Sequence, residues 1–353
     1  MKVKAAIKEY EVRLEDDLSF LQSFGAIENA FFVVDSKVWD LYGEYFHDIP
    51  KNALYLVDAV ENRKTIETAL DICERMVSMN AKRNAHLVSI GGGITQDLTG
   101  FAANVLYRGI AWTFVPTTLL AACDSCIGGK TSLNYKSYKN LLGTFYPPDT
   151  IYICPSFFET LSDSDLKSGL GEVVKFNVMG GERALASLED SLPDLLALDA
   201  STVNEFVKNS LEYKKGIIEE DEFDGGRRIY LNFAHTFGHA FEVSSGYRLP
   251  HGSAVAVGMV AANKVSRGRG LLDGDLAKRV ENVVSKVLPS IDFGFAHPGT
   301  VVRAIRKDKK QTGEQLTAVL LDSSFELRVV HDMTELEVLD ACEYADDFAK
   351  KLG

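Results

Sequence analysis

The first 155 residues and the rest of the chain show two different hydrophobic patterns. In the first part, short runs rich in β-branched and aromatic residues alternate with helical spacing, and the runs are Phe31 to Asp35, His86 to Ile90, Trp112 to Pro116 and Thr150 to Cys154. Such alternation is typical of an α/β domain. After about residue 160 the pattern becomes a succession of amphipathic helices. We therefore expect an α/β domain followed by a mainly α-helical domain, at residues 1–158 and 159–353.

Helical spacing is visible in both parts. In the first, one helical face is followed by Ile66, Leu70, Cys73 and Val77, and another by Leu98, Phe101, Ala102 and Val105. In the second, helices are predicted at 162–180, 200–217, 229–244, 252–269, 275–288 and 333–351. A hairpin is predicted from two runs, Gln315 to Leu321 and Phe325 to Val330, joined by a short polar turn.

Composition excludes several classes of partner. A chain of 353 residues exceeds the size at which one core stops growing, and its net charge of -12 opposes nucleic-acid binding. The N-terminus has no apolar signal core, and the most apolar stretch, Ile110 to Ala122, is too short to span a membrane. Five cysteines indicate no disulfide framework, and Cys123 and Cys126 are interpreted as buried thiols rather than a redox or metal pair. The expected location is the cytoplasm, without a membrane or nucleic-acid partner.

A triple glycine, Gly91-Gly92-Gly93, directly follows one predicted strand and precedes a predicted helix. A turn of this kind exposes backbone N–H groups at the start of the helix, where a diphosphate binds well. The spacing is not the usual G-x-G-x-x-G of dinucleotide-binding proteins. A tight turn without a ligand therefore stays open beside a nucleotide site.

A second segment brings Lys130, Lys139 and Asn140 close to two glycines, Gly128 and Gly129. Ammonium groups and amide donors can converge on a phosphate in a sheltered site. Surface lysines are commoner, but no amphipathic period runs through this segment, as it would in a solvated helix. The segment is therefore a candidate phosphate site.

Acidic, basic and imidazole side chains gather in the second part of the chain. Glu172 and Lys175 share a helical face within an apolar stretch, so at least one charge is expected near the interior, where a bound cation would balance it; a surface ion pair is the alternative. Three of the seven histidines, His235, His239 and His251, lie within 17 positions. Histidines with a carboxylate make a site for zinc or a similar ion. Spacing alone pairs His235 with His239.

Taken in order, these motifs resemble the 3-dehydroquinate synthase family, part of the sugar phosphate cyclases. The resemblance runs from about Asp35 to Leu321. It rests on Glu61-x-x-Lys64, the GGG turn with Asp97, Gly100 and Phe101, RG at Arg108, VPTTLLA from Val115, D-S-x-x-GGK-T from Asp124, KN at Lys139, GxxEVxK ending at Lys175, N-x-x-HTFGHA from Asn232, HG at His251 and DKK from Asp308. The family fold implies an N-terminal α/β domain that binds NAD and a helical C-terminal domain.

The resemblance also implies roles for single residues. NAD would be held by Asp35, Glu61, Lys64, Gly92, Gly93, Asp97, Thr117, Thr118, Lys130, Lys139, Phe157 and Thr160. A divalent metal, zinc or cobalt, would be held by Glu172, His235 and His251. The small phosphorylated sugar-acid substrate would be surrounded by Asp124, Lys130, Lys139, Asn140, Lys175, Lys214, Arg228, Asn232, His239 and one of Lys309 and Lys310. Arg108 would reach the phosphate from the neighbouring subunit of a homodimer.

The implied reaction is a lyase reaction that closes a carbocycle without net redox change. A ring hydroxyl is oxidised transiently by NAD, phosphate leaves by β-elimination, the hydride returns, and an intramolecular aldol step follows. His239 and the substrate phosphate would carry protons, while Lys130, Lys175 and Lys214 would stabilise oxyanions.

By the same resemblance, Arg228 and Asn232 occupy the family positions that bind a substrate carboxylate, a group that arginine binds in bidentate fashion. The resemblance therefore favours 3-deoxy-arabino-heptulosonate 7-phosphate as the substrate. The sequence departs from the family pattern at Lys37, Gln96, Ala234 and Ser253. These departures leave open a cyclase of the aminodehydroquinate or 2-deoxy-scyllo-inosose type. A metal-dependent polyol dehydrogenase is a further alternative, although it has no need of the lysine cluster. A non-catalytic binding protein would not explain the full ligand set.

Overall fold

A computed structural model describes residues 1–352 apart from 48, 137, 290–297 and 308–314. The chain forms two compact units, one of Met1–Thr160 with Ile218–Phe223 and one of Leu161–Ile217 with Asp224–Gly353. The return of Ile218–Phe223 to the first unit follows from contacts with its N-terminal segment, since the N–H groups of Lys4 and Ile7 donate to Glu219 and Glu222 at 2.8 Å. The division into functional domains at 1–158 and 159–353 stays a prediction. A single boundary cannot assign Ile218–Phe223 to the first unit, because these residues come after the boundary in the sequence.

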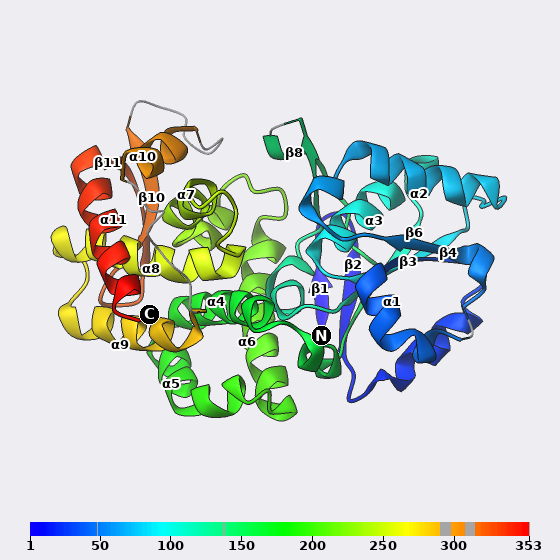
Figure 1. Cartoon of the computed structure of the whole chain (residues 1–353), viewed down its shortest axis with the longest axis horizontal. Coiled ribbons are helices and arrows are strands. Elements are labelled where there is room, and N and C mark those ends of the chain that lie inside the picture. The colour runs from blue at the N-terminus through cyan, green and yellow to red at the C-terminus, as the bar shows by residue number, and fades with distance from the viewer. Residues whose placement is uncertain (48, 137, 290–297, 308–314, 353) are drawn as a thin grey trace. The chain divides into compact units, whose positions relative to one another are not determined.

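The first unit is built on a seven-stranded sheet in the order β1-β2-β9-β6-β5-β3-β4 (Figure 1). Its strands are β1 Lys2–Lys4, β2 Glu9–Leu14, β3 Ala30–Asp35, β4 Leu54–Val57, β5 His86–Gly91, β6 Ala111–Pro116 and β9 Thr150–Ile153. All neighbours are parallel except β1, which runs antiparallel to β2. The predicted strands at β3, β5, β6 and β9 are confirmed. Strands β1, β2 and β4 were not predicted, because they are short or more polar.

Three helices connect strands of this sheet: α1 Ser36–Tyr42, α2 Ile66–Ser78 and α3 Gly93–Val105. Shorter helical segments are η1 Leu18–Ala26, η2 Gly43–Phe46, η3 Lys51–Ala53, η4 Glu61–Arg63, η5 Leu106–Arg108, η6 Ala121–Ser125 and η7 Pro155–Thr160. Cys123 in η6 and Cys126 directly after it are buried thiols, as expected.

The apolar spacing predicts α2 correctly, but it does not identify the face that packs on the unit. The buried residues are Thr68, Ala69, Ile72 and Met76. Leu70 and Val77 of the predicted row are exposed instead. In α3 the predicted row is buried at Leu98, Phe101 and Ala102, while Val105 is exposed.

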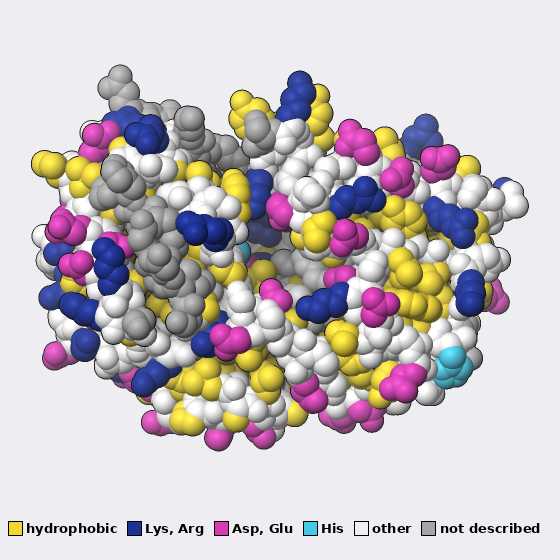
Figure 2. All heavy atoms as spheres, in the orientation of Figure 1, with side chains coloured by type: hydrophobic (Ala, Val, Ile, Leu, Met, Phe, Trp, Pro, Cys, Tyr) yellow, Lys and Arg dark blue, Asp and Glu magenta, His cyan; other side chains and the backbone are white. Residues whose placement is uncertain are grey.

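The segment without helical periodicity is a hairpin of β7 Lys130–Tyr135 and β8 Tyr138–Phe145, paired antiparallel. It is tied to the end of η4, because Asn134 donates its N–H to Lys64 O at 2.8 Å. Figure 2 shows hydrophobic and basic side chains at the free end of the hairpin, where Tyr135 and Tyr138 are exposed.

The second unit is mainly helical, as predicted. Its helices are α4 Asp163–Met179, α5 Glu182–Leu196, α6 Ala200–Glu220 (whose last residues belong to the first unit), α7 His235–Ser244, α8 His251–Gly268, α9 Gly274–Val287, α10 Pro298–Lys307 and α11 Glu335–Lys350. The predicted hairpin is confirmed as β10 Leu316–Leu321 and β11 Leu327–Met333.

One predicted helix, 229–244, is wrong in its first part. Residues Arg227–Asn232 form the 3-10 segment η8, and α7 begins only at His235. Ala234 interrupts the two with a positive φ of 68°. Helices α5 and α10 were not predicted. Among the described helices, none combines the length and apolar character needed to cross a membrane.

Candidate functional site

In the first unit, candidate residues gather at the carboxyl edge of the sheet. Asp35 ends β3, Gly92 follows β5 and Thr117 follows β6, and these strands are adjacent and parallel. Ligands of open α/β sheets bind outside this edge. Asp35 also caps α1, accepting the N–H of Lys37 at 3.0 Å, and burial raises the pKa of its carboxyl group.

The start of α3 has the features of an anion site. Gly92 is its N-cap and supplies no side chain to the first-turn N–H groups. A Cβ on Gly92 would lie 3.0 Å from Thr118 Cγ2, so a side chain there would crowd the next strand end. Gly93 leaves more room, since its added Cβ would meet only Ser125 Oγ, at 3.7 Å. Exposed N–H groups and the helix dipole both favour a phosphate at this position.

Lys64, Asp97 and Asn140 form one polar network with Ser132. Lys64 Nζ lies 2.5 Å from Asp97 Oδ2 and donates to Asn140 Oδ1 at 2.8 Å. Asp97 Oδ1 accepts the N–H of Ser132 at 2.8 Å. Burial raises the pKa of Asp97, against the opposing effect of Lys64. The network joins η4, α3 and the β7–β8 hairpin. The sequence alone does not show that these three segments meet.

Two further candidates belong to the rim of this network. Lys139 Nζ lies 3.5 Å from Glu61 Oε1, and Asn134 Nδ2 donates to the same oxygen at 2.8 Å. Phe157 and Thr160 lie in η7 instead, packed on Tyr42, whose hydroxyl is 2.8 Å from Thr160 Oγ1.

Asp124 and Lys130 lie around the turn that follows η6. Gln96, one of the departures from the family pattern, braces this turn with both ends of its buried amide. Its Nε2 donates to Ser125 O and its Oε1 accepts from Ser125 Oγ, each at 2.7 Å. Tyr10 accepts the N–H of Gly128 at 2.9 Å from the other side. Neither contact can be predicted from the sequence, because Gln96 and Tyr10 are distant from this turn along the chain.

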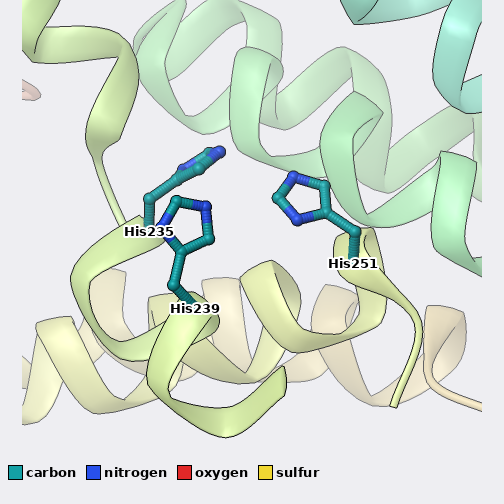
Figure 3. Close-up of side chains that lie close together, drawn as sticks. All are labelled: His235, His239 and His251. Carbon is teal, nitrogen blue, oxygen red and sulfur yellow. The ribbon is translucent and has the colours of Figure 1, made fainter. Parts of the chain in front are cut away.

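In the second unit, a carboxylate and three imidazoles meet. His235 and His239 project from α7 and His251 from the start of α8, and their rings point toward one another (Figure 3). Ligand nitrogens of the three histidines all lie within 4.8 Å of one another. Glu172 of α4 completes the cluster, with Oε1 at 3.2 Å from His251 Nε2 and 3.6 Å from His235 Nε2.

Close helix packing creates this cluster, and three glycines permit it. A Cβ on Gly171 would lie 2.0 Å from Gly252 O, so α4 approaches the start of α8 with no room for a side chain. The same holds between α7 and α8, where a Cβ on Gly258 would lie 2.4 Å from Ala234 O and one on Gly238 would lie 3.1 Å from Val255 Cα. The ligand distances therefore depend on backbone contacts between helices.

The arrangement fits a divalent metal. Two ligands at about 2.1 Å from one tetrahedral zinc ion lie about 3.4 Å apart, close to both distances measured from Glu172. Glu172 is fully buried, and neither of its oxygens receives a well-aligned hydrogen bond, although Lys175 Nζ lies 2.6 Å from Oε2. A buried carboxylate with spare lone pairs facing two imidazole nitrogens is a good cation site.

Contacts at the far ring nitrogens support His235 and His251 as the two imidazole ligands. His235 Nδ1 lies 3.0 Å from Phe233 O, a carbonyl that only accepts, so Nδ1 carries the proton and Nε2 keeps its lone pair. His251 Nδ1 lies 3.0 Å from Glu242 Oε2. Such outer contacts orient metal-binding histidines and raise their basicity. Sequence reasoning missed Glu242, although it follows His235 by two helical turns and so shares its face.

Neighbouring charges shift the pKa values of Glu172 and His251. Burial acts to raise the pKa of Glu172, but Lys175 and His251 outweigh it and hold this pKa at about 2. Burial acts to lower the pKa of His251, but its contacts with Glu172 and Glu242 raise it to about 10. Without a metal His251 is therefore an imidazolium at neutral pH, and a metal at Nε2 would take the place of that proton.

The remaining candidates of this unit bring positive charge to its interior. Lys175, Lys214 and Arg228 are all buried. Lys175 Nζ reaches Leu231 O at 3.5 Å, which places η8, with Arg228 and Asn232, beside α4. Lys309 and Lys310 lie outside the described residues.

Family models match most of the chain. Residues 54–168 match the 3-dehydroquinate synthase N-terminal domain and residues 169–311 match the C-terminal domain. The chain belongs to the 3-dehydroquinate synthase family. It is 32% identical over 357 residues to the 3-dehydroquinate synthase of Dictyoglomus thermophilum, covering 99% of both chains, and 37% identical over 279 residues to that of Geotalea uraniireducens, covering 78% of both.

Several solved structures share the fold of this chain. A 2-epi-5-epi-valiolone synthase from Streptomyces hygroscopicus subsp. jinggangensis, with NAD+ and Zn2+ bound, superposes with a TM-score of 0.86 at 25% identity, covering 96% of this chain and 97% of that one. A 2-deoxy-scyllo-inosose synthase has a TM-score of 0.83 at 23% identity, covering 97% and 98%. A probable glycerol dehydrogenase from Sinorhizobium meliloti reaches 0.66 at 15%, covering 96% and 97%, which shows a shared fold only.

Proposed function

We propose that this member of the 3-dehydroquinate synthase family converts 3-deoxy-arabino-heptulosonate 7-phosphate to 3-dehydroquinate and phosphate. The observation that carries the proposal is buried Glu172, whose Oε1 faces Nε2 of both His235 and His251 while each ring is held at Nδ1. We assign the metal to these three residues. His239, on the same helical face as His235, is left for the substrate.

We assign NAD to the carboxyl edge of the sheet in the first unit. The first-turn N–H groups of α3 at Gly92 and Gly93 would bind its diphosphate, and Asp35 would accept from a ribose hydroxyl. When bound, NAD and the metal would supply transient oxidation of a ring hydroxyl and polarisation of its oxygen.

The chain's own residues would bind the substrate and move its protons. Lys175 and Lys214, both buried, would stabilise oxyanions more strongly than solvated lysines do. His239 would pass protons to and from the ring. Arg228 and Asn232 share η8, so one short segment would bind the carboxylate and tell this substrate from sugar phosphates without that group.

Supporting roles belong to the remaining candidates. Lys130, Lys139, Asn140 and Asp124 would contact the substrate or the nicotinamide. Glu61, Lys64, Asp97, Thr117, Thr118, Phe157 and Thr160 complete the proposed NAD site. Metal and NAD dependence, lyase chemistry, a homodimer and a cytoplasmic location all follow from the proposal.

A phosphate-release assay tests the function. Purified protein with NAD, a divalent metal and the heptulosonate phosphate should release phosphate without accumulating NADH. Sedoheptulose 7-phosphate and glucose 6-phosphate serve as substrates without the carboxylate. If phosphate were released from one of these two compounds and not from the heptulosonate phosphate, that compound would be the substrate instead. Steady NADH formation from a polyol would refute the cyclase assignment.

The Arg228→Lys variant keeps the charge and removes the bidentate fork. It should raise the KM for the heptulosonate phosphate by about tenfold or more while NAD binding stays unchanged. Equal weakening of substrate and NAD would contradict the assigned role.

A further inference from the structure

Two candidate site residues, Asp124 and Lys130, lie at the two ends of one turn, which we name the 124–130 turn. The turn begins in η6, a single turn of π-helix, and ends at the first residue of β7. Isolated π turns are frequent at functional sites. Gly128 and Gly129 within the turn have positive φ values of 98° and 62°, so its backbone continues neither element. The conformation of the turn must therefore be set by contacts with other segments.

The middle of the 124–130 turn is buried, although its ends carry polar side chains. Cys126 is 0% exposed and Ile127 is 1% exposed, whereas Lys130 is exposed. Buried backbone N–H and C=O groups need partners within the protein. The partners that hold this backbone also set the directions in which the side chains of Asp124 and Lys130 leave it.

Gln96 of α3 supplies two contacts on one side of the turn. It is only 3% exposed, its Nε2 donates to Ser125 O, and its Oε1 accepts from Ser125 Oγ, each at 2.7 Å. A planar amide that is bonded at both ends fixes the position and the rotation of its partner. Ser125 directly follows Asp124, and its Oγ lies 3.7 Å from the place of a Cβ on Gly93. The contact thus holds the start of the turn against the first turn of α3.

Tyr10 of β2 supplies the contact on the other side. It is 2% exposed, and its hydroxyl accepts the N–H of buried Gly128 at 2.9 Å. The next carbonyl, Gly129 O, accepts the N–H of Tyr146 at 2.6 Å. Lys130 therefore begins β7 from a backbone that is held at both preceding residues.

Stability alone does not require a glutamine at position 96. A methionine or leucine side chain of similar volume would fill the same space without the cost of burying an amide. Gln96 is also one of the departures from the family pattern, so the resemblance does not imply this contact. What the amide adds is the orientation of Ser125, and with it the backbone direction at Asp124.

We infer that Gln96 and Tyr10 are positioning residues for Asp124 and Lys130, an inference that rests on the proposed function of those two side chains. Both act through the 124–130 turn, and neither is assigned a contact with substrate, NAD or metal. Groups at a reacting centre must be held to within about 0.5 Å, and a displacement of about 1 Å can cost about 100-fold in rate. Loosening the turn should therefore slow the reaction more than it weakens ligand binding.

Two variants of nearly unchanged size test this role. Gln96→Met and Tyr10→Phe remove the contacts and keep the bulk of each side chain. Each should lower kcat for phosphate release by about tenfold or more, while the affinity for Zn2+ stays within about threefold of wild type. NAD affinity, measured by calorimetry, should fall by a smaller factor than kcat. A thermal unfolding midpoint well above the assay temperature shows that each variant is folded.

Matched controls separate positioning from a general loss of contacts. Gln22→Met changes an exposed residue of η1, and Tyr344→Phe removes a hydroxyl group that donates to Glu281 Oε1 at 2.7 Å in the second unit. Both should keep kcat within about twofold of wild type. The positioning role would be refuted if Gln96→Met and Tyr10→Phe lowered kcat no more than these controls, or if Zn2+ affinity fell as much as kcat.

Hydrogen exchange followed by mass spectrometry tests the contacts without any need for activity. The backbone N–H groups of residues 121–130 should exchange at least about tenfold faster in Gln96→Met and in Tyr10→Phe than in wild type, while those of β5 should be unchanged. Unchanged exchange at 121–130 would overturn the inference. If wild type itself released no phosphate, the proposed function would fail, while the exchange rates would still decide whether Gln96 and Tyr10 hold the turn.

Discussion

We predict that metal affinity depends on Glu242, a residue outside the proposed ligand set. Its Oε2 lies 3.0 Å from His251 Nδ1, and its side chain is only 16% exposed, so water can replace it poorly. Glu242→Ala removes the acceptor and leaves the imidazole free to rotate. Glu242→Gln keeps a neutral acceptor of nearly the same shape and removes only the charge.

The two substitutions should weaken metal affinity by different amounts. Removing an outer partner of a metal-binding histidine typically weakens metal affinity by about 10- to 100-fold, or about 1.4 to 2.7 kcal/mol. A hydrogen bond to a charged acceptor is roughly twice as strong as a neutral one, so Glu242→Gln should lose about half of that free energy, roughly 3- to 10-fold in affinity. We therefore expect metal affinity to decrease in the order wild type, Glu242→Gln, Glu242→Ala.

Competition with a chromophoric chelator measures the affinity for Zn2+ or Co2+ without any need for activity. Glu343→Gln, an exposed glutamate on α11, is the matched control and should bind as wild type does. Thermal unfolding of the metal-free variants separates loss of the site from loss of the fold. If Glu242→Ala bound metal as tightly as the control, the assignment of His251 as an oriented ligand would be refuted.

Three further outcomes are expected. His239→Ala should abolish most phosphate release yet keep metal affinity within about threefold of wild type, whereas a 100-fold loss of metal would make His239 a ligand. Gly92→Ala should weaken NAD binding by about tenfold in calorimetry, because its Cβ crowds Thr118, while Gly43→Ala, whose Cβ meets nothing within 4 Å, should not. A hydrogen bond from Arg269 lowers the pKa of Glu337 to about 2, so this contact stabilises the fold above about pH 4.5 and is lost as the pH falls toward 2. Glu337→Gln should therefore cost up to about 1 kcal/mol in urea unfolding at pH 7 and less at pH 3.5; an equal cost at both would contradict the pKa.

Local signals were sufficient where an element depends mainly on its own residues. The apolar runs at β5 and β6 and the glycine turn between β5 and α3 fold as predicted, because parallel strands buried on both faces leave a continuous apolar run in the sequence. The expectation that at least one charge of Glu172 and Lys175 lies near the interior is also confirmed, and both residues are buried. Predictions fail where contacts with other parts of the chain set the backbone conformation. In the predicted helix 229–244, Ala234 has a positive φ and α7 begins only after it.

The amino-acid sequence by itself determined the family, the succession of an α/β part and a mainly helical part, and the residue types available for a metal and a phosphate. Only the tertiary structure decided which of these residues meet. Spacing pairs His235 with His239, but the contacts permitted by Gly171 and Gly258 bring Glu172 and His251 to His235 from two other helices. Periodicity along one helix specifies which residues share its face, and it has no information about what that face will contact.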